Sequence, residues 1–309
     1  MAKVLGLGIN MSKFMLEAHR AHRGERMPLI MGILNVTPDS LSDGGRFMTP
    51  DLAARQARAL FEQGADCLDI GAESTRPQAQ MISQAEERAR LFPMMEAVLG
   101  AIGDLPISLD TRRADIFGEM ISTWPDRDWV WNDVSALRFE ANNLQCAASF
   151  GRPVILMHAK GDGHILHGEP VYGDVVADIA CWLENRARQA IAAGLSAGHI
   201  VLDPGIGFGK QTNHNLALLR HLDSIVNLGF PVLVGASRKR FIGEIAPAHH
   251  ADMIPQDIAS DRLAGTIAAG LWANIRGVAL LRVHDVERMR QALQVWEAIA
   301  QAQRPAPVR

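Results

Sequence analysis

The chain has 309 residues, of which 48% are hydrophobic and 21% are charged, so it can form a large buried core and lacks the composition of a disordered protein. A net charge of -3 argues against a general affinity for nucleic acid or membrane surfaces, and no apolar run is long enough to span a bilayer. Three cysteines without CxxC spacing indicate reduced thiols, and the N-terminus lacks a clear secretory signal. Together these features predict a cytoplasmic protein.

Residues 1–27 carry no strong motif and are expected to be a lead-in packed on the following domain. From residue 28 onward, short apolar runs alternate with segments of helical spacing. The predicted helices include residues 51–63, 84–99, 175–193 and 213–222, and the first opens with Thr49 as cap and Pro50 in the first turn. The predicted strands are residues 28–36, 67–73, 106–111, 129–135, 153–158, 200–206, 231–237 and 278–284.

Eight strands that alternate with helices predict a single (β/α)8 TIM barrel in preference to an open doubly wound sheet. The barrel is expected to occupy residues 28–303, followed by a frayed tail at 304–309. Several predicted strands open with proline, which suits a strand start because no ladder donor is yet required there.

Polar side chains stand at the end of every predicted strand, and in a barrel enzyme the active site lies at these carboxyl ends. Any one of them is better explained as a structural polar residue or cap, but polar residues at all eight strand ends together predict a ligand site. The set comprises Asn35, Asp69, Glu73, Ser74, Thr75, Arg76, Asp110, Asn132, Asp133, His158, Asp203, Ser237, Arg238, Lys239, Arg282, His284 and Asp285.

The residue types suit a flat, polar heterocycle. Asp110, Asn132 and Asp203 supply acceptors for ring N–H and amino groups, and Lys239 supplies a donor. Arg282 can lie on a π face or, with Arg76 and His284, form an anion pocket for phosphate. The glycine-rich run 205–210 fits neither a dinucleotide fingerprint nor a P-loop, and protease, zinc-hydrolase and serine-esterase motifs are lacking.

Eight segments, in order, resemble the signature segments of the dihydropteroate synthase family. They are residues 31–45, 69–77 (DIGAESTRP), 108–111 (SLDT), 132–135 (NDVS), 156–158 (LMH), 202–210 (LDPGIGFGK), 235–239 with 241–243, and 282–286 (RVHDV). The resemblance implies a (β/α)8 barrel that joins 6-hydroxymethyl-7,8-dihydropterin diphosphate to 4-aminobenzoate, with magnesium, in folate synthesis. It also implies a homodimer, and no nucleic-acid or membrane partner is expected.

The resemblance further implies roles for individual residues. The implied pterin pocket consists of Asp110, Asn132, Met157, Asp203, Phe208, Gly235, Lys239 and Arg282. The implied diphosphate contacts are Asn35, which is also the implied magnesium ligand, with Thr75, Arg76, Arg282, Val283 and His284. The implied aminobenzoate side consists of Leu41, Pro77, Phe208, Lys239 and Arg240. The implied mechanism is dissociative, with charge stabilised on the leaving diphosphate before the amine attacks.

Three positions depart from the family pattern: Leu41 where phenylalanine is usual, Arg240 where serine is usual, and Gln78 where glycine is usual. The first two belong to the aminobenzoate side, and Leu41 motivates the hypothesis of an altered response to sulfonamides, with neutral drift compensated elsewhere as the alternative. They also leave open a pterin-binding paralogue with impaired or altered aminobenzoate use. A pterin-dependent methyltransferase domain is a third possibility, disfavoured by the presence of both diphosphate-handling segments.

Overall fold

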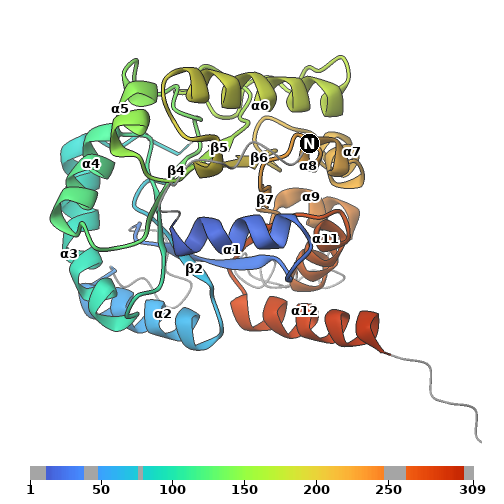
Figure 1. Ribbon diagram of the computed structural model, residues 1–309, viewed down its shortest axis with the longest axis horizontal. Coiled ribbons are helices and arrows are strands. Elements are labelled where there is room, and N and C mark those ends of the chain that lie inside the picture. Colours follow the sequence, from blue (N-terminus) through green and yellow to red (C-terminus); the bar gives the residue numbers. More distant parts are fainter. Residues whose placement is uncertain (1–11, 38–47, 76–78, 247–261, 303–309) are drawn as a thin grey trace, which may run out of the picture.

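A computed structural model describes residues 12–37, 48–75, 79–246 and 262–302 of the chain. In this part of the protein, eight parallel strands form one sheet surrounded by helices, which confirms the predicted (β/α)8 barrel (Figure 1). The strands are β1 (Leu29–Asn35), β2 (Cys67–Gly71), β3 (Ile107–Asp110), β4 (Trp129–Asp133), β5 (Val154–Met157), β6 (Ile200–Asp203), β7 (Leu233–Val234) and β8 (Leu280–Val283).

The sheet closes on itself. Its strand order is β6-β5-β4-β3-β2-β1-β8-β7, and a parallel bridge between Leu202 and Val232 joins the two outer strands. Strand β7 is much shorter than predicted because Pro231 has no N–H for the ladder and residues 235–239 leave the sheet to form the following loop. That early departure places Lys239 over the barrel mouth.

The helices that follow strands β1–β6 and β8 lie outside the barrel (Figure 1). Thr49 caps α2 by accepting a hydrogen bond from the Leu52 N–H, and Pro50 occupies the first turn, as the sequence predicts. The described helices are α1 (Lys13–His22), α2 (Pro50–Glu62), α3 (Gln84–Ala101), α4 (Ala114–Thr123), α5 (Asn143–Phe150), α6 (Val175–Ala192), η1 (Ala197–His199), α7 (Thr212–Arg220), α8 (Asp223–Val226), α9 (Arg240–Ile245), α11 (Leu263–Ile275) and α12 (Val286–Gln301).

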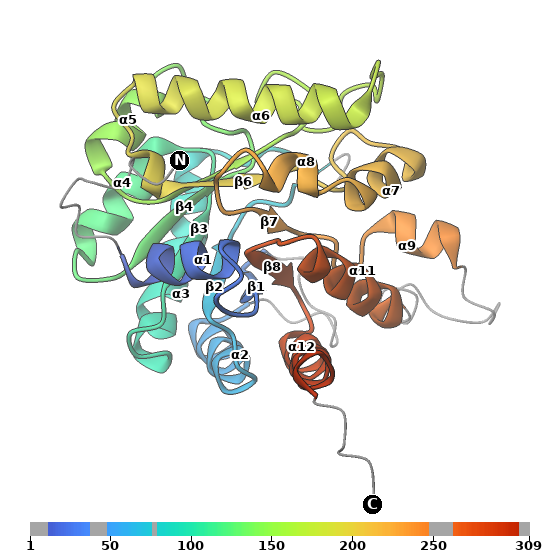
Figure 2. The ribbon, with the colours of Figure 1, turned by 45° about the vertical axis from the view of Figure 1, so that its right-hand side comes forward.

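Helix α1 lies across the amino-terminal end of the barrel, as Figures 1 and 2 show. Its apolar residues Phe14, Met15, Ala18 and Ala21 share one buried cluster with the inward-facing residues at the start of the strands. The Phe14 N–H also donates to Asp128, 2.9 Å away. The helix therefore closes the barrel floor and leaves the opposite mouth as the open end.

Among the described residues, no helix has the length and apolar character needed to cross a membrane.

Candidate functional site

The site is built from the inward-facing residues of the barrel strands. Side chains alternate between the two faces of a strand, and the first inward layer is the apolar cluster that contacts α1. Two residues further along, the next inward layer is mostly polar. It consists of Asp69, Asp110, Asn132, Asp203 and Arg282, together with the apolar Met157, and these residues come from six different strands. The register pairs Asp110 with Asn132 and Met157 with Asp203, so these predicted pterin residues are neighbours.

Asp69 is the centre of this polar layer. Its buried carboxylate accepts hydrogen bonds from Ser108 Oγ on β3 at 2.6 Å and from Asn132 Nδ2 on β4 at 3.1 Å. It also accepts one from Arg282 Nε at 2.6 Å. Charge-assisted bonds of this kind fix the orientation of their partners. Asp69 therefore fixes the orientation of Asn132 and Arg282, two of the predicted ligand-binding side chains.

Arg282 joins this hub to the mouth of the barrel. Its second guanidinium nitrogen lies 3.2 Å from Asp110 Oδ2. Burial and then the negative charge of Asp69 raise the pKa of Asp110 to about 8, and Arg282 only partly opposes them. The ionised form of Asp110 is thus short of hydrogen-bond donors, and a ligand with ring N–H groups would supply them.

Asp203 and Lys239 provide the opposite side of the pocket. Asp203 Oδ1 accepts a hydrogen bond from the Gly205 N–H at 2.7 Å, yet burial still raises the pKa of its carboxyl to about 6. Burial and the nearby Arg282 lower the pKa of Lys239 to about 8. Its ammonium lies 4.1 Å from the centre of the Phe208 ring, so Lys239 contacts both predicted half-sites.

The loop that carries Phe208 is held by a buried ammonium group. Lys210 Nζ lies 2.9 Å from the carbonyl oxygens of Gly205 and Phe208 and 3.1 Å from His158 Nδ1. Gly205 has φ +66°, and a Cβ there would stand 2.0 Å from the His158 carbonyl oxygen. The glycine-rich run is therefore required for the loop to pass close to β5, and Lys210 supplies its internal donor.

A second hydrogen-bonded unit lies beyond β7 and β8. Ser237 Oγ accepts from the His284 backbone N–H at 3.2 Å and lies 3.0 Å from His284 Nδ1. Burial, and then the charges of Arg238 and Arg282, lower the pKa of His284 to about 3, so its ring is neutral. In the tautomer in which the Ser237 hydroxyl donates to Nδ1, Nε2 carries the ring hydrogen. His284 can then donate to an anion from Nε2.

Several polar residues at the predicted strand ends serve the scaffold. Glu73 pairs with Arg112 at 2.6 Å, and both side chains are only 6% exposed. The carboxylate of Asp133 accepts from the backbone N–H groups of Ser135 and Leu137. Asp133 directly follows the inward-facing Asn132, so it points to the outer face of the strand. The pleat thus separates ligand-facing from structural residues.

The other predicted site residues fall into three groups. Asn35, at the end of β1, and Thr75, after β2, are partly buried near the mouth, and Met157 is buried in the wall. Gly235 follows β7, whereas the Val283 side chain belongs to the apolar layer between barrel and helices. Arg240 is 79% exposed and pairs with Glu244 at 3.1 Å. Leu41, Arg76 and Pro77 lie outside the described residues, as does Gln78.

The strand-end analysis missed the loop between β5 and α6. His167 in this loop contacts Thr75 and Phe208, which belong to the loops after β2 and β6. The sequence offered no periodic signal there, because the loop has no regular structure between Lys160 and His167 beyond one isolated bridge.

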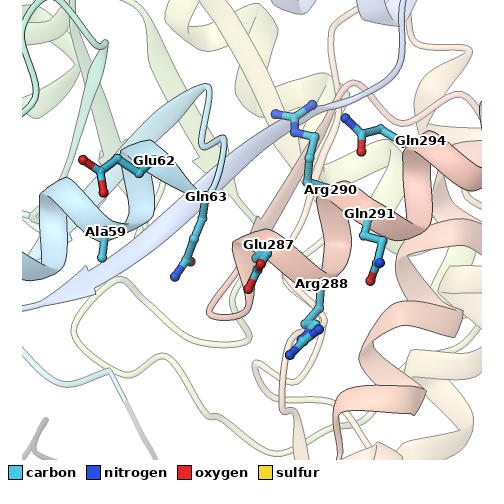
Figure 3. Close-up of a pocket in the computed structure, with 8 residues that line it drawn as sticks. All are labelled: Ala59, Glu62, Gln63, Glu287, Arg288, Arg290, Gln291 and Gln294. Carbon is cyan, nitrogen blue, oxygen red and sulfur yellow. The ribbon is translucent and has the colours of Figure 1, made fainter.

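A polar groove of about 580 Å³ lies on the outside of the barrel between α2 and α12 (Figure 3). Glu62 and Gln63 line one side of the groove, and Glu287, Arg288 and Gln291 line the other. None of the polar residues of the barrel mouth lines this groove, so it is distinct from the candidate site.

Comparison with known proteins agrees with this arrangement. Residues 31–284 match the family described as pterin binding enzyme. Dihydropteroate synthase of Neisseria meningitidis serogroup B (strain ATCC BAA-335 / MC58) is 41% identical over 293 residues, which cover 94% of this chain and 99% of that protein.

Solved structures give the same result. The structure of Xanthomonas albilineans dihydropteroate synthase with 4-aminobenzoic acid has a TM-score of 0.79 and 41% identity, and the match covers 90% of this chain and 94% of that chain. The structure of the same enzyme in complex with 7,8-dihydropteroate has a TM-score of 0.76 and 39% identity, with 90% and 95% covered. The eight-stranded barrel, the polar layer at its mouth and these extensive matches show that the chain belongs to the dihydropteroate synthase family.

Proposed function

We propose that this protein joins 6-hydroxymethyl-7,8-dihydropterin diphosphate to 4-aminobenzoate, giving 7,8-dihydropteroate and diphosphate in folate synthesis. The observation that carries the proposal is the convergence of Asp110, Asn132, Asp203 and Lys239 on one barrel mouth, in a chain 41% identical to a dihydropteroate synthase. A transferase of this family needs a polar pocket for a pterin beside a cationic region for diphosphate.

The pterin half of the reaction relies on hydrogen-bond complementarity. The carboxylates of Asp110 and Asp203 accept from the ring N–H and amino groups, and the amide of Asn132 both donates and accepts. Burial has raised the pKa of both carboxyls, so pairing with ligand donors relieves a desolvation cost. A ligand lacking these donors leaves buried acceptors unpaired and is selected against.

The diphosphate half relies on Arg282 and His284, with Thr75, Arg76 and the Val283 backbone as further proposed contacts. The neutral His284 donates from Nε2, and Arg282 contributes positive charge between the pterin pocket and the phosphates. Developing negative charge on a leaving diphosphate is stabilised by such fixed donors, which need no rearrangement during bond cleavage.

Magnesium is proposed as the metal. Asn35 offers one amide oxygen at the mouth, and the described residues contain no cluster of three or more His, Cys, Asp or Glu side chains that would form a complete metal site. This donor set fits magnesium, which takes few protein ligands and binds phosphate oxygens and water. When bound, magnesium supplies further positive charge to the leaving group.

Bond cleavage precedes attack in the proposed mechanism. The C–O bond between the pterin methylene and diphosphate breaks, and the bonding electrons leave with diphosphate. The buried acceptors Asp110 and Asp203 stabilise the electron-poor pterin. The amine of 4-aminobenzoate then forms the new C–N bond and loses one proton. Phe208 and the stem of Lys239 form the described wall for its ring, and Leu41, Pro77 and Arg240 are proposed for the remainder of this side.

The test is a turnover assay with both substrates and magnesium that measures dihydropteroate and released diphosphate together. Equal formation of both products, dependent on both substrates, is expected. Asp110→Asn should lower turnover strongly, whereas Asp115→Asn, an exposed change in the first turn of α4, should not. Pterin binding without turnover, or methyl transfer from a methyl-pterin donor, would overturn the proposal.

We also propose that the protein forms a homodimer in the cytoplasm. Trp272 and Ile275 on α11, with Val295 and Ile299 on the neighbouring α12, are exposed apolar side chains that a second copy would cover. Light scattering measures the mass, and a monomer at micromolar concentration would contradict the dimer. The cysteines at 67, 146 and 181 are free thiols, which suits a reducing compartment.

A further inference from the structure

His167 lies where three loops of the candidate site meet. Its Nε2 is 2.8 Å from the carbonyl oxygen of Thr75, in the loop after β2. Its ring stacks on Phe208, in the loop after β6, with centroids 5.1 Å apart and planes inclined by 18°. One side chain thus contacts a residue of the diphosphate half and a residue of the aminobenzoate half.

The hydrogen-bonding state of His167 follows from its partner. A carbonyl oxygen only accepts, so Nε2 carries the ring hydrogen and donates it to Thr75. Burial lowers the pKa of His167, outweighing the bond to Thr75, and the charges of Lys239 and Lys210 lower it further. The ring is therefore neutral near pH 7, and the contact with Phe208 is a stack of two aromatic rings.

The backbone around His167 is anchored. His167 forms a parallel bridge with Lys160, and the Gly168 N–H donates to the Lys160 carbonyl oxygen at 2.6 Å. The preceding Leu166 is buried in a small cluster with Met157, against which Phe208 packs. The imidazole ring is thus presented from a fixed base.

We propose that His167 is a positioning residue that couples the two half-sites, holding the Thr75 backbone for the diphosphate and the Phe208 ring for the aminobenzoate. The proposal rests on the proposed function. His167 lies in the loop between β5 and α6, away from the strand ends. Its side chain makes two contacts that can be removed separately, the hydrogen bond from Nε2 to Thr75 and the stacking of its ring on Phe208.

Two substitutions separate these contacts. His167→Phe keeps an aromatic ring against Phe208 and removes the donor to Thr75, whereas His167→Gln keeps an amide donor of similar reach and removes the stack. His167→Phe should raise the KM for the dihydropterin diphosphate about fivefold, the effect of one lost hydrogen bond, with little change for aminobenzoate. His167→Gln should raise the KM for aminobenzoate about two- to tenfold, with little change for the other substrate.

The matched control is His164→Gln, in the same loop. The ring of His164 packs on Phe139, 4.6 Å between centroids, and its side chain is exposed. This control should leave both KM values unchanged. Thermal unfolding of all variants tests whether each is folded.

The crossed pattern of KM changes supports the coupling role. Unchanged KM values in both His167 variants, or equal changes of both KM values in each variant, would overturn it, because a merely structural role has no reason to separate the substrates. An inactive wild-type enzyme would instead refute the proposed function, so the two failures are distinguishable.

Discussion

The carboxyl group of Asp203 provides a quantitative test of the pterin pocket. Its side chain is 6% exposed, and burial raises its pKa from 3.8 to about 6 despite the Gly205 hydrogen bond and the nearby positive charges of Lys239 and Lys210. Asp203→Asn removes the ionisable group but keeps an oxygen that can accept from Gly205. The substitution therefore isolates the cost of burying the charge.

The size and sign of the effect follow from linkage between protonation and folding. At roughly 1.4 kcal/mol per pH unit, a rise from 3.8 to about 6 corresponds to about 3 kcal/mol. The unfolded chain releases this proton at lower pH than the folded protein. The contribution of Asp203 to stability is therefore lost as the pH rises from about 4 to above 6.

The assay is equilibrium urea denaturation of the ligand-free wild type and Asp203→Asn between pH 4 and pH 8. The variant should gain up to about 3 kcal/mol relative to the wild type across this interval, while its affinity for the pterin substrate falls. Asp126→Asn, at an exposed position, is the control. A difference in unfolding free energy that stays constant between pH 4 and pH 8 would refute the claim that burial of the carboxylate is costly.

Three further changes test other parts of the site. Arg112→Met removes the hydrogen-bonded cation of the buried Glu73 carboxylate, leaving Arg113 at 3.7 Å, and should cost about 3 kcal/mol in urea denaturation; a loss below about 1 kcal/mol would contradict a buried pair. Lys210→Met removes the donor to the Phe208 carbonyl and should raise the KM for aminobenzoate at least about fivefold in steady-state kinetics, more than it changes kcat. Leu41→Phe should lower the inhibition constant of a sulfonamide about two- to tenfold by adding an aromatic wall; equal constants in both proteins would remove the hypothesis.

The conformation of the loop that carries Phe208 was predicted only in part from the spacing of its glycines. The glycine-rich run 205–210 indicates close backbone approach, and the structure shows that approach against the His158 carbonyl. The sequence did not indicate that the Lys210 side chain would donate hydrogen bonds to the carbonyl oxygens of Gly205 and Phe208 in the same loop. That arrangement depends on the position of β5, because the bonded His158, directly after that strand, is 52 residues away along the chain.

The sequence by itself determined the alternation of strands and helices, because apolar runs and helical spacing are local properties of the chain. It also determined which residues stand at the strand ends, and hence that Asp110, Asn132 and Asp203 would meet at one mouth. Strand ends converge in any parallel barrel, so this prediction required no detailed geometry.

Only the tertiary structure decided which polar residues face the pocket. Asn132 and Asp133 are adjacent in sequence, yet the pleat turns Asn132 into the barrel and Asp133 toward the scaffold. Likewise, Asp69 accepts a hydrogen bond from Arg282, 213 residues later in the chain, only because the folded barrel brings these two residues together. The physical reason is that a side chain's partners are set by strand register and barrel closure, which depend on the packing of the whole chain.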